Sequence, residues 1–291
     1  MQDGVGFNID ALVPRDMARK AETSGVAKAT LGPLRMFALA VLAGAFIALG
    51  AIFATTVTTG STLPFGLTRL LGGLVFCLGL ILVVGAGAEL FTGNNLIVMA
   101  WADGKVTTWQ LLRNWVIVYI GNFVGSVATA VMMLWSQQYT FANGAVGQNV
   151  LNTANAKVNL AFGQALVLGI MCNALVCLAV WLCLGGRSAT DKVLSIIFPI
   201  TAFVAAGFEH SVANMYFIPM GLLVKSSASA EFWSQIGSSA EAYANLTWGN
   251  FFLRNLLPVT IGNIIGGALM VGLVYWFIYL RPTWTGAKTV Q

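Results

Sequence analysis

Residues 193–224 read VLSIIFPITAFVAAGFEHSVANMYFIPMGLLV, an apolar stretch that is interrupted near its middle by Glu209 and His210. His210 is the only histidine in this sequence of 291 residues. An ionisable pair in the middle of a membrane-length segment is costly unless it lines a cavity or a path through the bilayer. The tract therefore predicts a membrane protein with a transport site at His210.

Composition supports a membrane location for the whole chain. Hydrophobic residues make up 58% and charged residues 9%, whereas soluble domains carry about 25% charged residues. The net charge of +5 comes from basic residues scattered between apolar spans, so a nucleic-acid partner is not expected. The cysteines lie in apolar segments without zinc or redox spacing, which predicts small buried side chains rather than a metal or cofactor site: Cys77, Cys172, Cys177 and Cys183.

Five further apolar stretches can each supply a helix of about 20 residues that crosses the hydrocarbon core. They cover residues 36–58, 70–88, 114–135, 158–186 and 255–280. The second continues past Glu89 into 90–102, just as 193–208 continues past Glu209 and His210 into 211–224. Each composite is too long for one crossing and too short for two. We expect two broken helices whose unwound backbone faces protein or water, with a simple kink as the alternative at each break.

The two halves of the chain resemble each other. IGNFVGS at 120–126 matches IGNIIGG at 261–267, and GAE at 87–89 matches GFE at 207–209. Three spans per half force the second half to insert upside down, as in inverted-repeat transporters. We therefore expect a single all-α domain of six transmembrane helices with helices 2 and 5 broken. Residues 34–135 are the first three-helix repeat, 158–281 the second, and 282–291 a cytoplasmic tail.

Basic residues predict the orientation. Eleven of them flank one side of the predicted spans and four flank the other, so both termini are expected in the cytoplasm. The first group is Arg15, Arg19, Lys20, Lys28, Arg35, Lys105, Arg113, Arg187, Lys192, Arg281 and Lys288, and the second is Arg69, Lys157, Lys225 and Arg254. Residues 1–33 lack the apolar run of a cleavable signal peptide. Within them, 7–30 is amphipathic and is expected to lie on the membrane surface, with a gate below the pore as the alternative.

Five tracts carry a resemblance to a known family. They are GLILVVGAGAELFT at 79–92, NWVIVYIGN at 114–122, AVWLCLGGRS at 179–188, GFEHSVANMYFIPMG at 207–221 and PVTIGNIIGG at 258–267. Together they are similar to the formate/nitrite transporter family over nearly the whole chain. The resemblance implies an aquaporin-like protomer, a homopentamer with one pore per subunit, and passage of formate, nitrite and similar small anions across the bacterial inner membrane.

The resemblance also implies roles for individual residues. Thr92 and His210 are expected to face each other across the pore centre. Apolar constrictions would be built by Phe76, Leu80, Leu90 and Phe203, and Lys157 and Asn173 would lie toward the periplasmic vestibule. Glu209, Asn214 and Asn263 would arrange the histidine region, and Phe91 would be a further supporting residue. The residues TGNN after Phe91 depart from the family pattern, in which smaller or β-branched residues are expected.

An anion in the middle of a bilayer loses its hydration at a cost of several kcal/mol. Two devices can lower that cost. The broken helices can aim their N-terminal N–H groups at the anion. His210 can also donate a hydrogen bond or a proton, so that a weak acid crosses in neutral form and transport depends on pH.

Other functions remain open from the residues. A nitrite or hydrosulfide channel fits the same scaffold. A neutral-solute aquaporin is disfavoured because neither break contains Asn-Pro-Ala and an ionisable pair occupies the second. A membrane enzyme would need converging ligands, acids or bases that one histidine and two intramembrane glutamates hardly supply. A purely structural scaffold would not need Glu89, Glu209 and His210 within the membrane.

Overall fold

The computed structural model describes residues 11–281, and every regular element in that range is a helix. Six segments are long and apolar enough to cross a membrane, as predicted. They are α2 (Pro33–Thr58), α3 (Phe65–Ala86), α5 (Thr108–Trp135), α7 (Phe162–Gly185), α8 (Ala189–Ala206) and the segment Ala240–Tyr279. The tail 282–291 and the start of the predicted amphipathic segment, 7–10, lie outside the described residues.

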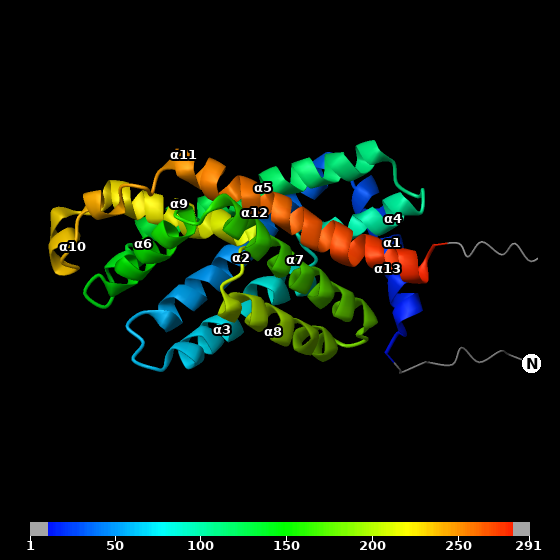
Figure 1. The fold of residues 1–291 in the computed structure, drawn as a ribbon, viewed down its shortest axis with the longest axis horizontal. Coiled ribbons are helices and arrows are strands. Elements are labelled where there is room, and N and C mark those ends of the chain that lie inside the picture. The colour runs from blue at the N-terminus through cyan, green and yellow to red at the C-terminus, as the bar shows by residue number, and fades with distance from the viewer. Residues whose placement is uncertain (1–10, 282–291) are drawn as a thin grey trace, which may run out of the picture.

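Shorter helices complete the spans (Figure 1). They are α1 (Pro14–Thr30), η1 (Gly93–Ile97), α4 (Val98–Ala102), η2 (Gln138–Thr140), α6 (Ala145–Val158), α9 (Ser211–Ser227), α10 (Ala230–Gln235) and η3 (Ala240–Tyr243). The last crossing is one continuous helix with two π-helical stretches, η4 and η5. It consists of α11 (Trp248–Asn250), η4 (Phe251–Leu256), α12 (Leu257–Ile264), η5 (Ile265–Leu273) and α13 (Val274–Tyr279).

Several predicted boundaries differ from the structure. The span predicted at 158–186 begins only at Phe162, because residues 145–158 form the separate helix α6 and the chain turns at 159–161. α5 begins six residues before the predicted 114, because the Thr107 side chain and Gln110 form a capping box. The last helix begins at Trp248 rather than at 255. The piece predicted at 90–102 is helical from Gly93 onward, as the 3₁₀-helix η1 followed by the short α4, and only 90–92 lie outside a helix.

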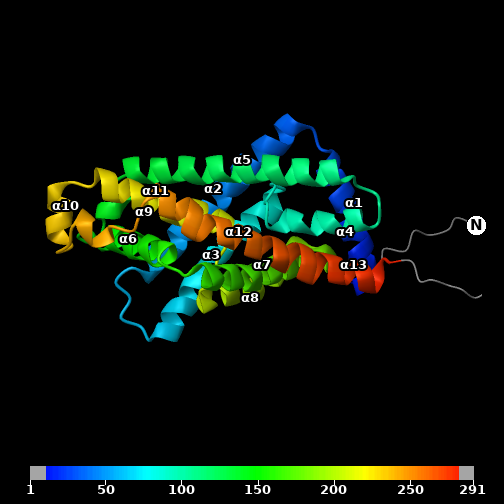
Figure 2. The same cartoon turned by 45° about the horizontal axis from the view of Figure 1, so that its top comes forward.

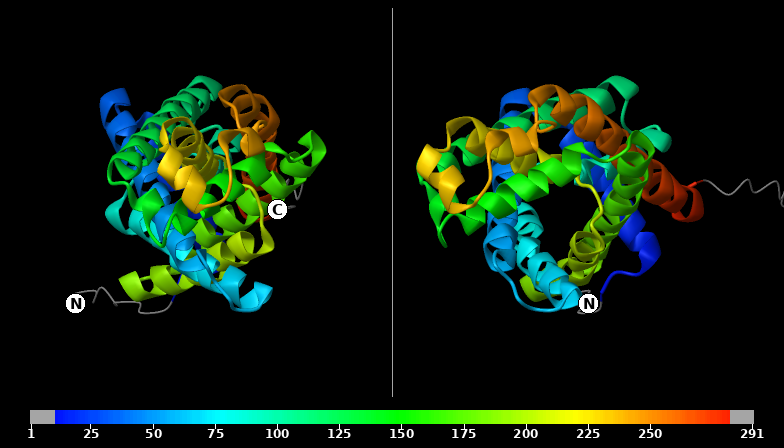
Figure 3. Two further views of the ribbon diagram at one scale, coloured as in Figure 1. Left: turned by 90° about the vertical axis from the view of Figure 1, so that its left-hand side faces the viewer. Right: turned by 60° about the vertical axis from the view of Figure 1, so that its left-hand side comes forward.

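The long helices run side by side around a common centre (Figure 3). α2 packs against α3 and α5, α7 packs against α8 and α12, and α3 packs against α8. Figure 2 shows α6 and α10 at one end of the molecule and α1, α4 and α13 at the other. The first and last helices, α1 and α13, touch each other at that second end. All four cysteines are buried free thiols, as predicted.

Glycines let the helices approach closely at two matching places. A Cβ on Gly125 of α5 would overlap the carbonyl oxygen of Val41 in α2, and one on Gly266 of η5 would overlap that of Ile170 in α7. Small residues at such positions allow close backbone contact inside a membrane. The repeated IGN tracts thus place the same close crossing in both halves.

We expect Gly266→Val to lower the thermal unfolding temperature in detergent, because α7 and η5 must move apart. Overpacking of this kind typically costs about 1–3 kcal/mol. Gly66→Val is the matched control, because a Cβ at Gly66 meets nothing within 4 Å. Equal unfolding temperatures for the two variants would contradict the importance of this crossing.

Candidate functional site

The two breaks have the same local construction. α3 ends at Gly87 and α8 ends at Gly207, and both glycines have φ of 77°, in the left-handed region that ends helices. A glutamate follows two residues later in each case, Glu89 and Glu209. Both glutamates are at most 5% exposed. The breaks therefore place two carboxylates in the interior of the helix assembly.

At the second break, a lysine and two asparagines surround Glu209. Lys157 of α6 donates to Glu209 Oε1 at 2.7 Å. Asn214 and Asn255 donate to Oε2 at 2.7 and 3.1 Å, and Asn255 also donates to the Lys157 carbonyl oxygen. A buried carboxylate is tolerated only when it is paired and hydrogen-bonded. Here all of its bonds come from elements that converge on the break.

The first break repeats this arrangement with other residues. Lys28 of α1 donates to Glu89 Oε1 at 2.7 Å, and Asn94 donates to Oε2 at 2.6 Å. Asn94 also donates to Asn114 Oδ1, and Asn114 donates to the Lys28 carbonyl oxygen. α1 therefore holds the same place at the first break as α6 holds at the second.

A further asparagine ties each unwound backbone to the helix assembly. Asn122 donates to the Glu89 carbonyl oxygen and accepts from the Phe91 N–H. Asn263 donates to the Glu209 carbonyl oxygen and accepts from the Ser211 N–H. These contacts satisfy backbone groups that have no helical partner, which is the requirement for irregular backbone at membrane depth.

His210 joins the two breaks. Its Nε2 lies 3.0 Å from Thr92 Oγ1, and its Nδ1 accepts the Ala213 N–H at 3.0 Å. Because Nδ1 is an acceptor, the proton of the neutral ring lies on Nε2 and points toward Thr92. His210 is thus both the N-cap of α9 and a hydrogen-bond donor from one break to the other.

Two N–H groups at the start of α9 already have acceptors and are not free to bind an anion. Ser211 N–H donates to Asn263 Oδ1, and Ala213 N–H donates to His210 Nδ1. The expectation that helix N-termini at the breaks bind the anion directly therefore does not hold for these two groups. The His210 ring borders two of the neighbouring cavities, and its Nε2–H donates to Thr92 Oγ1.

Three cavities follow one another past His210. The α6-side vestibule has a volume of about 610 Å³ and the α1-side vestibule about 370 Å³. A central chamber of about 10 Å³ is lined by Phe76, Leu80, Leu90, Phe203 and His210, among others. Phe76 and Phe203 border the chamber and the α6-side vestibule, whereas Leu80 and Leu90 border the chamber and the α1-side vestibule.

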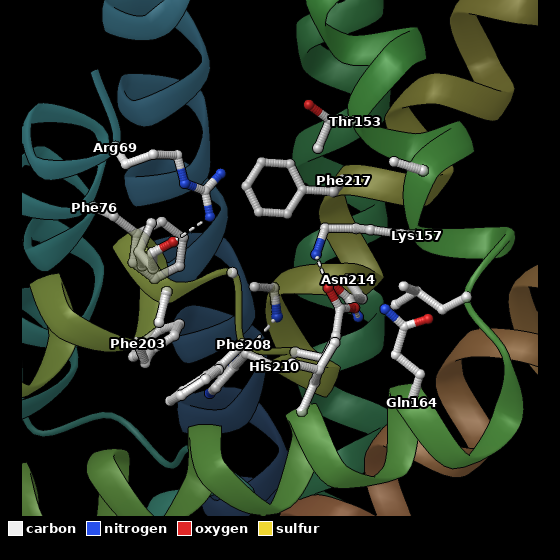
Figure 4. Close-up of a pocket in the computed structure, with 18 of the residues that line it drawn as sticks. Arg69, Phe76, Thr153, Lys157, Gln164, Phe203, Phe208, His210, Asn214 and Phe217 are labelled. Carbon is white, nitrogen blue, oxygen red and sulfur yellow. Dashed lines mark hydrogen bonds and ion pairs between the residues drawn. The ribbon is translucent and has the colours of Figure 1, made fainter. Parts of the chain in front are cut away.

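Aromatic rings shape the narrow passage on the α6 side. Phe76 and Phe203 meet edge to face at 5.8 Å, and the Phe203 ring stacks on His210 at 5.9 Å. Phe217 stacks on Phe76 and lies under the Lys157 ammonium group, 5.5 Å from it. Figure 4 shows these side chains around the vestibule. These rings make the boundary between the α6-side vestibule and the central chamber largely apolar.

Residues 15–277 match the model of the protein family described as formate/nitrite transporter. The chain belongs to the formate/nitrite transporter family. The formate channel FocA of Escherichia coli strain K12 is 52% identical over 94% of this chain and 96% of its own length. FocA of Haemophilus influenzae is 46% identical over 90% of this chain and 93% of its own.

Solved structures agree with this family assignment. A pentameric formate channel with formate bound aligns with a TM-score of 0.82 and 47% identity, covering 86% of this chain and 98% of that one. A second structure, an FNT family ion channel, aligns with a TM-score of 0.78 and 29% identity over 90% and 98% of the two chains. Membership of a transporter family excludes the membrane enzyme and the structural scaffold.

Most of the residues selected from the sequence come together at this site, but Asn173, Thr92 and Phe91 line none of the three cavities. Asn173 is fully buried. It donates instead to the Thr92 and Asn263 carbonyl oxygens, because α7 packs behind the first break. Thr92 is also fully buried and contacts His210 from behind the cavities. Phe91 packs against Trp115 and Tyr119, away from the chamber.

Sequence reasoning missed several partners of the two breaks. In the sequence analysis Lys28 counted only toward the orientation, and Asn94 and Asn114 at the first break and Asn255 at the second had no assigned role. The signal was present in the spacing. Each Glu is followed by an Asn five residues later, and Asn114 and Asn122 are as far apart as Asn255 and Asn263.

The helix α1 packs on protein. Ala18, Ala21 and Ala29 are buried against α4, η1, α5 and α7. Its Glu22 accepts from Lys105 at 2.5 Å, and burial raises the pKa of the Glu22 carboxyl. Through Lys20, Ser24 and Lys28, α1 also forms one wall of the α1-side vestibule. α1 is therefore a helix docked on protein beside the cavity, and its position at the membrane surface stays a prediction.

Proposed function

We propose that this chain is a formate channel of the bacterial inner membrane, with one pore in each protomer of a homopentamer. The pore runs from the α6-side vestibule past Phe76 and Phe203 to His210, and then past Leu80 and Leu90 to the α1-side vestibule. The observation that carries the proposal is the position of the imidazole, which borders the central chamber between two apolar constrictions. The formate channels named among its relatives support formate as the substrate.

The chemistry follows from the desolvation cost. The constrictions remove water from the anion, and the Nε2–H of His210 replaces a lost hydrogen bond when it turns from Thr92 Oγ1 to the anion. When the ring takes a second proton, Nδ1 becomes a donor and must release the Ala213 N–H. The ring can then pass a proton from Nε2 to the carboxylate, so that the neutral acid leaves the chamber. Flux should therefore rise as the pH falls.

The orientation and the repeats complete the proposal. Both termini lie in the cytoplasm, as the distribution of basic residues predicts, so the α6-side vestibule opens to the periplasm.

The first repeat then begins with α1 rather than at residue 34, and the second begins with α6, because each helix supplies the lysine of its break. Protons and membrane lipid are the other partners. Nitrite is a second candidate substrate, since the matching family is described by both anions.

We expect proteoliposomes containing this protein to take up formate and nitrite well above the rate of protein-free liposomes, and more rapidly at lower pH. Glycerol should enter no faster than in the protein-free control, because the chamber offers a neutral polyol no compensation for its lost water. Stopped-flow swelling measures the entry of the anions and of glycerol, and labelled formate gives a second measure of formate uptake. Rapid glycerol entry, or formate uptake equal to the leak of formic acid through lipid, would refute the proposal.

A further inference from the structure

Arg69 lies in the α6-side vestibule and has no role in the site described so far. It belongs to the first turns of α3, and its side chain reaches the last turn of α8. Its Nε donates to the Ala205 carbonyl oxygen at 3.0 Å and its Nη2 to that of Val204 at 2.6 Å. A Cβ on Gly207 would lie 3.2 Å from Nη2, so the guanidinium group lies directly beside the second break.

The charge balance of this vestibule singles out Arg69. Its charged lining residues are Arg69, Lys157 and Glu209. Lys157 and Glu209 form an ion pair at 2.7 Å, so their charges largely cancel at a distance. Arg69 is paired with no carboxylate among residues 11–281, because its hydrogen bonds go to neutral carbonyl oxygens. The net positive charge of the vestibule is therefore that of Arg69.

Figure 4 shows Arg69 and Lys157 entering the vestibule from opposite walls. The bonds to α8 use Nε and Nη2, and no group among the described residues accepts from Nη1. A guanidinium group has five N–H donors in a fixed fork that suits carboxylates. Arg69 therefore combines an unpaired charge with free donors above the aromatic constriction.

We infer that Arg69 captures the small carboxylate anion in the α6-side vestibule before the anion meets Phe76 and Phe203. Charge in a cleft with apolar walls concentrates counter-ions and speeds their entry. The Lys157–Glu209 pair supports the break instead of attracting the anion from a distance. This inference rests on the proposed function, because it assigns the entry step of the same pore.

The test compares Arg69→Gln, Arg69→Lys and wild-type full-length protein in proteoliposomes, with formate flux measured over a range of formate concentrations. At low ionic strength, Arg69→Gln should raise the half-saturating formate concentration about fivefold and change the maximal flux little. Arg69→Lys should stay near wild type. The difference should shrink at high salt, because charges are screened over about 10 Å at 0.1 M.

Arg254→Gln is the matched control, because it removes one exposed positive charge from η4, outside the vestibule lining. It should leave the half-saturating concentration unchanged. A purely structural role for Arg69 in capping α8 would lower the unfolding temperature or the maximal flux without this salt-dependent shift. An unchanged half-saturating concentration in Arg69→Gln, or an equal change in Arg254→Gln, would overturn the inference. Either result leaves the proposed function intact, because that is tested by the formate and glycerol uptake of the wild-type protein.

Discussion

His210→Asn should reduce formate flux about tenfold or more and remove its pH dependence. The variant loses the imidazole that borders the chamber, and with it the Nε2–H that can turn from Thr92 to the anion and the ring that can carry a proton. A hydrogen bond to a charged group is worth about 1.5–3 kcal/mol, which corresponds to roughly one to two powers of ten in rate. Initial rates of formate uptake from pH 5 to 8, roughly the range in which histidine titrates, provide the measurement.

Asparagine is the informative replacement because it can still cap α9. His210 accepts the Ala213 N–H at the start of that helix, and asparagine is among the preferred residues for this role. His210→Ala should lose both the flux and about 1 kcal/mol of stability, since alanine cannot cap. If His210→Asn keeps both the wild-type flux and its pH profile, the imidazole has no part in transport.

Glu209→Gln should lower the free energy of unfolding by about 3–5 kcal/mol, more than His210→Ala does. The variant leaves the Lys157 ammonium group without its carboxylate in a mostly buried site. The side chain of Lys157 is only 16% exposed. A marked fall of the thermal unfolding temperature in detergent is the expected result. Lys157→Met in the same protein should restore much of the loss, because the unpaired charge is then gone as well.

The first break supplies the internal control. Glu89→Gln breaks the corresponding pair, but the side chain of Lys28 is 31% exposed and can regain water. Its loss should therefore be smaller than that of Glu209→Gln. Two results would show that burial of the lysine does not determine the loss of stability. One is an equal loss in Glu89→Gln and Glu209→Gln, and the other is a Glu209→Gln/Lys157→Met variant no more stable than Glu209→Gln alone.

The pattern of apolar runs was enough to predict the six crossings and the two breaks. Charges inside a hydrophobic stretch are rare, so Glu89, Glu209 and His210 indicated the unwound segments directly. α6 could not be found in this way, because polar residues such as Gln148, Asn152 and Asn155 make it look like a loop. Its helix is fixed by packing against α9, which hydropathy does not describe.

The details of the site depend on distances between atoms. Lys28 is one of several basic residues near the N-terminus, and nothing in its local sequence distinguishes it from Lys20. Only the docking of α1 brings it to Glu89. The position of the proton on His210 likewise follows from the Ala213 N–H, and the burial of Asn173 follows from the packing of α7 behind Thr92.

Because the chain has a single histidine, nitrogen-15 labelling of histidine gives a spectrum in which every imidazole signal belongs to His210. Solid-state NMR of the labelled, tag-free protein in lipid bilayers can therefore observe the ring during a formate titration. The account predicts a neutral ring protonated at Nε2, whose Nε2 signal shifts as formate is added and not with glycerol. A ring protonated at Nδ1, or an Nε2 signal that saturating formate leaves unmoved, would contradict it.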